Sequence, residues 1–338
     1  MTYPNTPSRS ASTGRRRLLA LAASVVALTA VPATQAADAG DWPNRPVTLI
    51  VPFAPGGPTD ITARVLGDAL SKMWNQTVVI ENRAGAGGTI GAATAARAKA
   101  DGYTLVLGVT GSHGIAGSLY TRLPYDPAKD FDAIAKVVIY PNAILAHPDV
   151  PAKNLQELIE LAKTNPEYQV YGSDGNGTAS HLTMELLREK AGFPANAVQY
   201  KGASPLINDI VGGFVKYGIT GLPSAESQVK AGSLKLLAIT TDKDYSNSGY
   251  PTISEQGFPG FVAAPWSGIF SPKGTPRPVV EKIAYDIKTA MTSPDVTQKL
   301  TTLGLTPMPI ILGDFEADLA KERASWAEAV KVSGAKVD

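Results

Sequence analysis

Three glycine-containing turns carry the residue types best suited to binding a small ligand. They lie at residues 53–60, 172–181 and 200–204, and each leads from a short apolar run into a segment of helical period. Free backbone N–H groups converge at the start of a helix, the macrodipole adds about half a positive charge, and glycine lets a ligand approach the backbone closely. A single glycine turn is often only a tight connection between two elements. Two clusters of free backbone amides, one in each half of the molecule, favour a shared binding site for an anion.

Other chemistries fit these residues poorly. Residues 172–179 lack the lysine and the following serine or threonine of a phosphate-binding loop, and Gly85-Ala86-Gly87 is followed by Ile90 where a dinucleotide fingerprint needs glycine. The three histidines match no zinc motif, cysteine is absent, and no serine lies in a Gly-x-Ser-x-Gly elbow. We expect no catalytic residue, no metal and no cofactor. The alternative is an enzyme whose acid and base are brought together only by folding.

Short apolar strands alternate with amphipathic helices along the chain and would position these turns. Strands are expected at 47–51, 78–80, 104–109, 134–140, 143–146, 169–171, 198–200, 214–220 and 234–240. The helix that starts near Thr59 carries an apolar stripe through Ile61, Val65 and Met73. This rhythm is typical of parallel sheets covered by helices, in which ligands bind at the carboxyl ends of the strands.

Two breaks divide the chain into two lobes. Pro141-Asn142 separates two extended runs, and a return crossing fits best at 265–270. We expect lobe 1 to comprise residues 37–140 and 263–338, and lobe 2 to comprise residues 141–262. The predicted fold class is α/β, with two mainly parallel sheets flanked by helices and joined by two hinge crossings.

The amino terminus has the pattern of a secretory signal peptide. Arg15–Arg17 precede an apolar run at 18–31, and small residues follow at 33–37. The run is shorter than the roughly 20 residues that a membrane span needs. We expect residues 1–36 to be a signal peptide cleaved after Ala36. A twin-arginine signal and a retained anchor are the alternatives.

Composition narrows the compartment and the partners. The absence of cysteine excludes disulfides and a lipidated cysteine anchor, which with the signal favours the periplasm. Four of the 31 basic residues and none of the 30 acidic ones precede Ala37, so the mature chain is slightly acidic. No cluster of lysine and arginine residues indicates a nucleic-acid-binding surface.

Several motifs occur in one order along the whole mature chain. They are Trp42-Pro43, Pro52–Asp60, Glu81–Gly88, Asp101–Leu105, the turn ending at His181, Tyr200–Gly202 and Pro251–Ile253. In these motifs the chain resembles the Bug family, the TctC-like periplasmic receptors of tripartite tricarboxylate transporters. The resemblance implies a periplasmic-binding-protein fold of the Venus flytrap type (type II) that closes on a small organic acid. It also implies a membrane permease as partner, or a sensor for an orphan receptor, and we expect a monomer.

Family members typically hold a carboxylate between the first two turns through backbone amides and ordered water. The corresponding residues of this chain, together with residues of neighbouring polar turns, are the candidate ligand-binding residues. They are Phe53, Pro55, Gly56, Gly57, Thr59, Asp60, Ser112, His113, Gly172, Ser173, Gly175, Asn176, Gly177, Thr178, His181, Tyr200, Lys201, Thr220 and Trp266. Asp60 would orient its loop or a water, because like charges repel. His181 has a helix-capping role as its alternative.

One departure from the family pattern bears on the ligand. Many members carry acids where this chain has Lys216 and Thr220. Without an acid at Thr220 the distal pocket would be less negative, which favours a ligand with a second anionic or aromatic group. Terephthalate then competes with citrate-like acids, and Trp266 would supply an aromatic wall, unless it belongs to the core.

Overall fold

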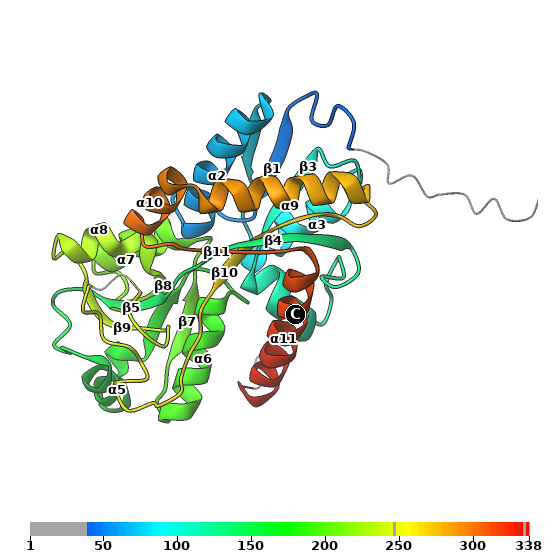
Figure 1. The fold of residues 1–338 in the computed structure, drawn as a ribbon. Helices are drawn as coiled ribbons and strands as arrows, with labels where there is room; N and C mark the ends of the chain where they lie inside the picture. The colour runs from blue at the N-terminus through cyan, green and yellow to red at the C-terminus, as the bar shows by residue number, and fades with distance from the viewer. Residues whose placement is uncertain (1–38, 246–247, 334–335, 338) are drawn as a thin grey trace, which may run out of the picture. The chain divides into compact units, whose positions relative to one another are not determined.

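The first sheet has six strands and forms the centre of lobe 1. The computed structural model describes residues 39–245, 248–333 and 336–337, so the predicted signal peptide and its cleavage site lie outside the described residues. The strand order is β11-β4-β10-β3-β1-β2 (Figure 1). The strands are β1 (Val47–Val51), β2 (Val78–Asn82), β3 (Thr104–Val109), β4 (Phe131–Ile139), β10 (Trp266–Pro272) and β11 (Thr306–Ile311).

Helices and helical turns join these strands. They are α2 (Pro58–Trp74), η2 (Ala86–Gly88), α3 (Thr89–Ala96), η3 (Thr110–Ile115), α4 (Ala116–Leu119), α9 (Arg277–Thr292), α10 (Pro294–Thr302) and α11 (Leu312–Ser333). Helices α2 and α9 pack against each other over one face of the sheet (Figure 1). Leu66 of α2 and Ile283 of α9 are fully buried with Leu49 and Leu107 of the strands. Burial of each such side chain contributes about 1.5–3 kcal/mol.

The second sheet has five strands in the order β7-β6-β8-β5-β9 and forms the centre of lobe 2. The strands are β5 (Asn142–Ala146), β6 (Val170–Ser173), β7 (Asn196–Gln199), β8 (Tyr217–Gly221) and β9 (Lys235–Ile239). The accompanying helices are α5 (Leu155–Thr164), η4 (Pro166–Tyr168), α6 (Ala179–Ala191), α7 (Ala203–Val211) and α8 (Leu222–Lys230). Two apolar clusters, one with α5 and α6 and one with α7 and α8, pack against this sheet.

Both sheets are mixed, whereas mainly parallel sheets were expected. Strand β1 pairs in parallel with β2 and β3, but β10 is antiparallel to β3 and β4. In lobe 2, β6 is parallel to β7 and β8, but β5 is antiparallel to β8 and β9. The reason is that β5 and β10 are the first strands after each crossing. They lead away from the place where the chain passes between the sheets, whereas β1, β3, β6 and β8 run toward that place and end at the turns.

The chain crosses between the sheets twice, and the two crossings are bonded to each other. Tyr140 N, just after β4, donates to Pro265 O at 3.0 Å. Thr240, just after β9, links both crossings: Asn142 N donates to Thr240 Oγ1 at 3.0 Å, and Thr240 Oγ1 donates to Ala263 O at 2.6 Å. The return crossing ends before Trp266, where β10 begins, so most of the segment expected to cross (265–270) is strand. We propose these passages as the lobe boundaries.

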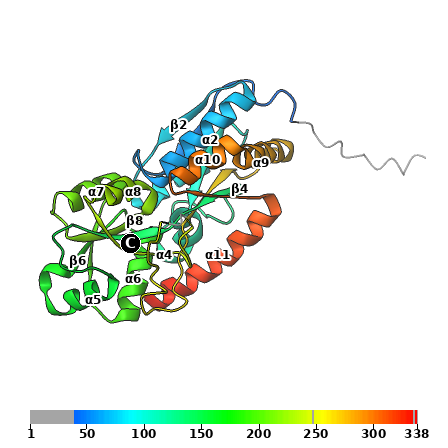
Figure 2. The same cartoon turned by 60° about the vertical axis from the view of Figure 1, so that its left-hand side comes forward.

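Helix α11 packs on both lobes. It follows β11 of the first sheet and contacts η3 and α4 on one side and α6 on the other (Figure 2). Trp326 of α11, 8% exposed, lies in an apolar cluster with Ile115 and Leu119 of lobe 1 and Leu182 of lobe 2. The last helix is therefore a third connection between the lobes.

Candidate functional site

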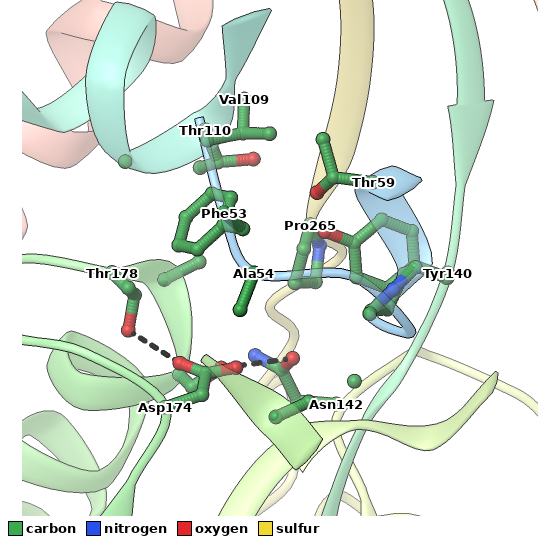
Figure 3. A pocket seen from close by; sticks show the side chains of 17 residues that line it. Phe53, Ala54, Thr59, Val109, Thr110, Tyr140, Asn142, Asp174, Thr178 and Pro265 are labelled. Carbon is green, nitrogen blue, oxygen red and sulfur yellow. Dashed lines mark hydrogen bonds between the residues drawn. The ribbon is translucent and has the colours of Figure 1, made fainter. Parts of the chain in front are cut away.

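A cleft lies where the turns of both lobes meet, at the carboxyl ends of β1, β3, β6 and β8 (Figure 3). It is lined by Phe53, Ala54, Gly57, Pro58, Thr59, Val109, Thr110, Gly111, Tyr140, Asn142, Asp174, Thr178, Ala179, Ser180, Ala203, Gly221 and Pro265. Its volume of about 40 Å³ has room for only a few water molecules, so the lobes are closed. Of the residues predicted from sequence, Phe53, Gly57, Thr59 and Thr178 line the cleft.

Asp60 fixes the first turn and does not line the cleft. Its carboxylate, in a residue only 3% exposed, accepts hydrogen bonds from Gly56 N at 3.0 Å and from Asn82 Nδ2 at 2.9 Å. Arg64 donates to both carboxylate oxygens at 2.9 Å. Burial raises the pKa of Asp60, but these hydrogen bonds and the charge of Arg64 outweigh it and lower the pKa overall. Asp60 is therefore ionised and already paired.

The amino terminus of α2 offers backbone amides to the cleft. Gly57 is the N-cap, Pro58 follows it, and no capping side chain bonds this end among the described residues. The N–H groups of Thr59 and Asp60 lie in the first turn, where the helix has no carbonyl to accept them. Gly57 and Thr59 both line the cleft, so this end of α2 suits a negatively charged group.

The second turn uses several of its amides internally. Gly177 N donates to His181 Nδ1 at 3.3 Å, and His181 N donates to Thr178 Oγ1 at 3.2 Å. Thr178 N donates to Gly175 O at 3.3 Å, and Gly175 N donates to Ser173 Oγ at 3.4 Å. The N–H groups of Ala179 and Ser180 lie in the first turn of α6, and both residues line the cleft, so the expected pair of opposed amide clusters stays a prediction. His181 belongs to the cap of α6, and burial lowers its pKa.

Asp174, which the sequence reasoning missed, is the acid of the cleft. Its Oδ1 accepts from Thr178 Oγ1 at 2.9 Å, and its Oδ2 accepts from Ser180 Oγ at 3.0 Å and from Thr220 Oγ1 at 2.9 Å. Burial raises the pKa of Asp174 more than these hydroxyl groups lower it. Its position inside the second glycine turn, between two residues already singled out, was the available signal.

The expectation that the pocket around Thr220 is less negative than in other family members stays a prediction, but an acid does lie beside Thr220. Thr220 is fully buried and does not line the cleft, but its hydroxyl bonds the carboxyl group of Asp174. An acid is therefore present at this place, supplied by a different strand-to-helix turn. No lysine, arginine or histidine is among the described residues that line the cleft.

Tyr140 and Asn142 bring the first crossing into the cleft, and sequence reasoning missed both. Burial raises the pKa of Tyr140, and the charge of Asp174 raises it further. Asn142 is 1% exposed, and its Oδ1 accepts from Ser180 Oγ at 3.1 Å. Its Nδ2 has no hydrogen-bond partner among the described residues. Figure 3 shows the side chains of Asn142 and Asp174 side by side.

Three candidates belong to the core of lobe 1. His113 is fully buried, and its ring stacks on Phe270 with centroids 4.0 Å apart. Burial, together with the charge of Arg323, lowers the pKa of His113 to about 3, so the ring is neutral. Ser112 is buried against it, with Oγ 2.9 Å from the ring Nδ1. Trp266 is also fully buried, which excludes the aromatic wall expected from it.

Other candidates lie near the cleft without lining it. Tyr200 donates to Asp209 at 2.7 Å, and Lys201 is exposed. Gly172 lies within β6, where a Cβ would overlap Leu206. Ser173 is fully buried. The remaining candidates outside the cleft lining are Pro55, Gly56, Gly175, Asn176 and Gly177.

Glycines and carbonyl groups form several of the contacts between the closed lobes at the cleft. Ser204 Oγ donates to Pro55 O at 3.1 Å, and a Cβ on Gly56 would lie 2.9 Å from that hydroxyl. The Tyr120 hydroxyl lies 3.3 Å from Asn176 O, and a Cβ on Gly87 would overlap the same carbonyl. The closed arrangement therefore depends on small residues.

A third close approach lies beside the first crossing, where a Cβ on Gly221 would lie 2.5 Å from Pro58 Cγ.

None of the helices within residues 39–245, 248–333 and 336–337 combines the length and hydropathy needed to span a membrane. These residues also contain no group of three or more His, Cys, Asp or Glu side chains suited to a metal ion.

Comparison with known proteins identifies the family. A family model described as the tripartite tricarboxylate transporter family receptor, TctC, matches residues 62–329. Protein BugT of Bordetella pertussis is 34% identical over 323 residues, which cover 95% of this chain and 98% of that protein. An R. palustris protein solved with adipate is 35% identical with a TM-score of 0.84, covering 88% of this chain and 100% of that one.

MatC from Rhodopseudomonas palustris, solved with bound malate, is 32% identical with a TM-score of 0.79. The match covers 86% of this chain and 100% of that one. The two-lobed α/β fold expected from the sequence is confirmed by these structures. The chain therefore belongs to the TctC family of tripartite tricarboxylate transporter receptors, the Bug-type periplasmic solute-binding proteins.

Proposed function

We propose that this protein captures a small carboxylate, chiefly a dicarboxylate, in the periplasm and delivers it to the permease of a tripartite transporter. The family supports the receptor role, and two similar structures hold adipate and malate. We further propose that the chain is exported by its predicted signal peptide, with cleavage near Ala36, and acts as a monomer.

The observation that carries the proposal is the amino terminus of α2 inside a closed cleft. Gly57 and Thr59 face a space that residues of both lobes enclose, and the helix end there has no capping side chain among the described residues. A carboxylate bound at these amides would contact both lobes at once. Its binding energy would offset the loss of freedom when the two lobes are fixed against each other.

The lining residues limit the size and shape of the ligand. Phe53 and Tyr140 are the aromatic rings at the cleft, so a flat ring such as that of terephthalate has an apolar surface to contact. The closed volume of about 40 Å³ favours a shorter aliphatic acid unless the lobes stand further apart around the ligand. The ligand panel must therefore contain both kinds.

Thermal unfolding with adipate, malate, citrate and terephthalate tests this function. A true ligand stabilises the folded state by about 2.7 kcal/mol when its concentration is a hundred times its dissociation constant, and the effect follows a binding curve. A monoamine of similar size should give no shift. Chemical conversion of the stabilising acid during incubation, followed by chromatography, would contradict the receptor function.

A variant at Gly57 links the effect to the cleft. The backbone of Gly57 has φ −84°, which any residue adopts, and space around its Cβ position is open. Gly57→Leu should therefore fold normally but fill the cleft and abolish the stabilisation by carboxylates. Circular dichroism checks the fold. A folded Gly57→Leu protein with unchanged affinity would remove the α2 terminus from the site.

A further inference from the structure

The hydroxyl groups around Asp174 have more acceptors than protons. Ser180 Oγ lies 3.1 Å from Asn142 Oδ1 and 3.0 Å from Asp174 Oδ2, and a single hydroxyl proton can serve only one of them. Thr178 Oγ1 likewise lies 2.9 Å from Asp174 Oδ1 and 2.8 Å from Gly175 O.

Thr220 Oγ1 makes the last of these contacts, to Asp174 Oδ2 at 2.9 Å. A proton on Asp174 Oδ2 would complete the chain of donors. Asp174 would then donate to Ser180, and Ser180 to Asn142 Oδ1.

The amide of Asn142 adds a donor that a ligand anion could use. With its Oδ1 accepting from Ser180, its Nδ2 is left as a donor without a partner among the described residues, in a side chain that lines the cleft. A buried donor without a partner is costly, and a ligand oxygen would satisfy it. Asn142 Nδ2 and a neutral carboxyl group together suit an anion.

We propose that Asp174 takes up one proton from solvent when the cleft binds a carboxylate, so that capture of the anion is coupled to protonation. The proton passes to Asp174 Oδ2, and no other covalent bond changes. This inference rests on the proposed function, and it names a specificity-determining residue of that site. It also explains how an acid can lie in an anion cleft without a cation in its lining.

The groups around Asp174 favour this assignment. Tyr140 on the crossing is the titratable side chain that faces it, and it is neutral because its pKa is raised. The other titratable groups on the adjoining helices have partners of their own. Asp60 of α2 is paired with Arg64, and His181 of α6 accepts from Gly177 N. A ligand carboxylate enclosed beside an ionised Asp174 would be repelled at short range, and protonation removes the repulsion.

Calorimetric titration with adipate, and with malate in a second series, tests the coupling. Titrations at one pH in buffers of different ionisation enthalpy give the number of protons taken up. We expect uptake approaching one proton per ligand near pH 7.5. Between about pH 6.5 and 8.5, where simple carboxylates stay ionised, affinity should fall by up to tenfold per pH unit as the pH rises.

Two variants show whether Asp174 or another acid takes up the proton. Asp174→Asn should bind without proton uptake, with affinity independent of pH and higher than that of the wild type near pH 8.5. Glu255→Gln is the matched control, because Glu255 also accepts a threonine hydroxyl, from Thr252 at 3.0 Å, but does not line the cleft. That variant should keep the proton uptake of the wild type.

Each contrary result has a distinct meaning. Binding of adipate or malate without proton uptake overturns this inference and leaves the proposed function standing. Preferential binding of an amino acid such as aspartate, lost in Asp174→Asn, also overturns it, because an ionised Asp174 would then hold the ammonium group. No binding of any carboxylate overturns both. The measurement on the wild type decides the matter even where Asp174→Asn fails to fold.

Discussion

Two aspartates near the cleft have opposite environments, although both lie in strand-to-helix turns. Asp60 is surrounded by Arg64, Asn82 and a backbone amide, and its pKa is lowered. Asp174 accepts hydrogen bonds from the hydroxyl groups of Thr178, Ser180 and Thr220 and has no paired cation among the described residues, and its pKa is raised by burial. Full cations lower a carboxyl pKa more than neutral hydroxyls do, because they add charge to hydrogen bonding. The first aspartate stabilises the turn, and the second is free to titrate.

Asp60→Asn should lower the free energy of unfolding by about 1–3 kcal/mol near neutral pH, because it weakens several bonds to a buried carboxylate. The folded pKa of Asp60 lies below the usual value of about 4, so its stabilisation is complete above that pH and is lost as the pH falls through the folded pKa. The difference in the free energy of unfolding between the variant and the wild type should therefore disappear in acid. Urea unfolding at several pH values measures this difference.

Asp68→Asn is the control for that experiment. Asp68 is exposed on the same helix and carries the same charge. Its substitution should change the free energy of unfolding by less than about 0.5 kcal/mol at any pH. A gap for Asp60→Asn that stays constant down to strong acid would contradict the ion pair as its source.

At the scale of elements, the loop between β2 and α3 meets the turn before α6. Gly87 of η2 has φ 61°, and a Cβ there would overlap Asn176 O across the cleft. The Tyr120 hydroxyl donates to Ala86 O at 3.0 Å and reaches the same Asn176 carbonyl. Closure therefore brings two backbone segments into direct contact.

Gly87→Ala should weaken ligand binding by about tenfold or more, because the added methyl group disfavours the closed arrangement that binds. Gly192→Ala is the matched control, since Gly192 has φ 64° but open space around its Cβ position. Both variants carry the strain of a left-handed alanine, and only the first should lose affinity by calorimetry. Equal affinities would show that the contact is not needed for closure.

Elements were more predictable from the sequence than the site. Strand β1, the turn before α2 and the amphipathic α6 follow from local periodicity and glycine placement. The stripe expected on α2 is only partly confirmed: Ile61 and Val65 are half-buried against the core of lobe 1. Met73 is 44% exposed, and Leu66 and Leu70 are buried instead, because sheet contacts select between neighbouring stripes.

The site depended on contacts between distant segments. Asp174 meets Thr220 and Asn142 only through the order of strands in the second sheet, which a local pattern does not contain. His113 follows a strand in the same way as the turns that line the cleft, but its ring turns into the core against Phe270. Side-chain direction after a turn is set by packing, so several of the residues expected from the sequence do not line the cleft, although parts of the first two turns do.

On the scale of the whole molecule, α11 and the two crossings connect the lobes. Trp326 lies in one apolar cluster with Ile115 of lobe 1 and Leu182 of lobe 2, and its indole donates to Glu322 at 3.1 Å. A large buried side chain at such a place couples the unfolding of one half to that of the other. We therefore expect a single cooperative transition for residues 39–338.

Trp326→Ala should lower the free energy of unfolding by about 3–5 kcal/mol and split the calorimetric transition in two. Trp74→Ala is the matched control. Trp74 is 7% exposed, and its indole also donates to an acid, Asp286, but it lies within the core of lobe 1. That variant should lose similar stability in one transition. Two transitions in the wild type would contradict the coupling.

Glycines such as Gly56, Gly87 and Gly221 line the seam between the halves, and this has an energetic consequence. Glycine has no rotamers to immobilise and little apolar area to remove from water, so bringing these surfaces together costs little and gains little. These glycine contacts therefore add little attraction between the halves, in contrast to the apolar cluster around Trp326. A carboxylate bound in the cleft would supply the attraction that this part of the seam lacks.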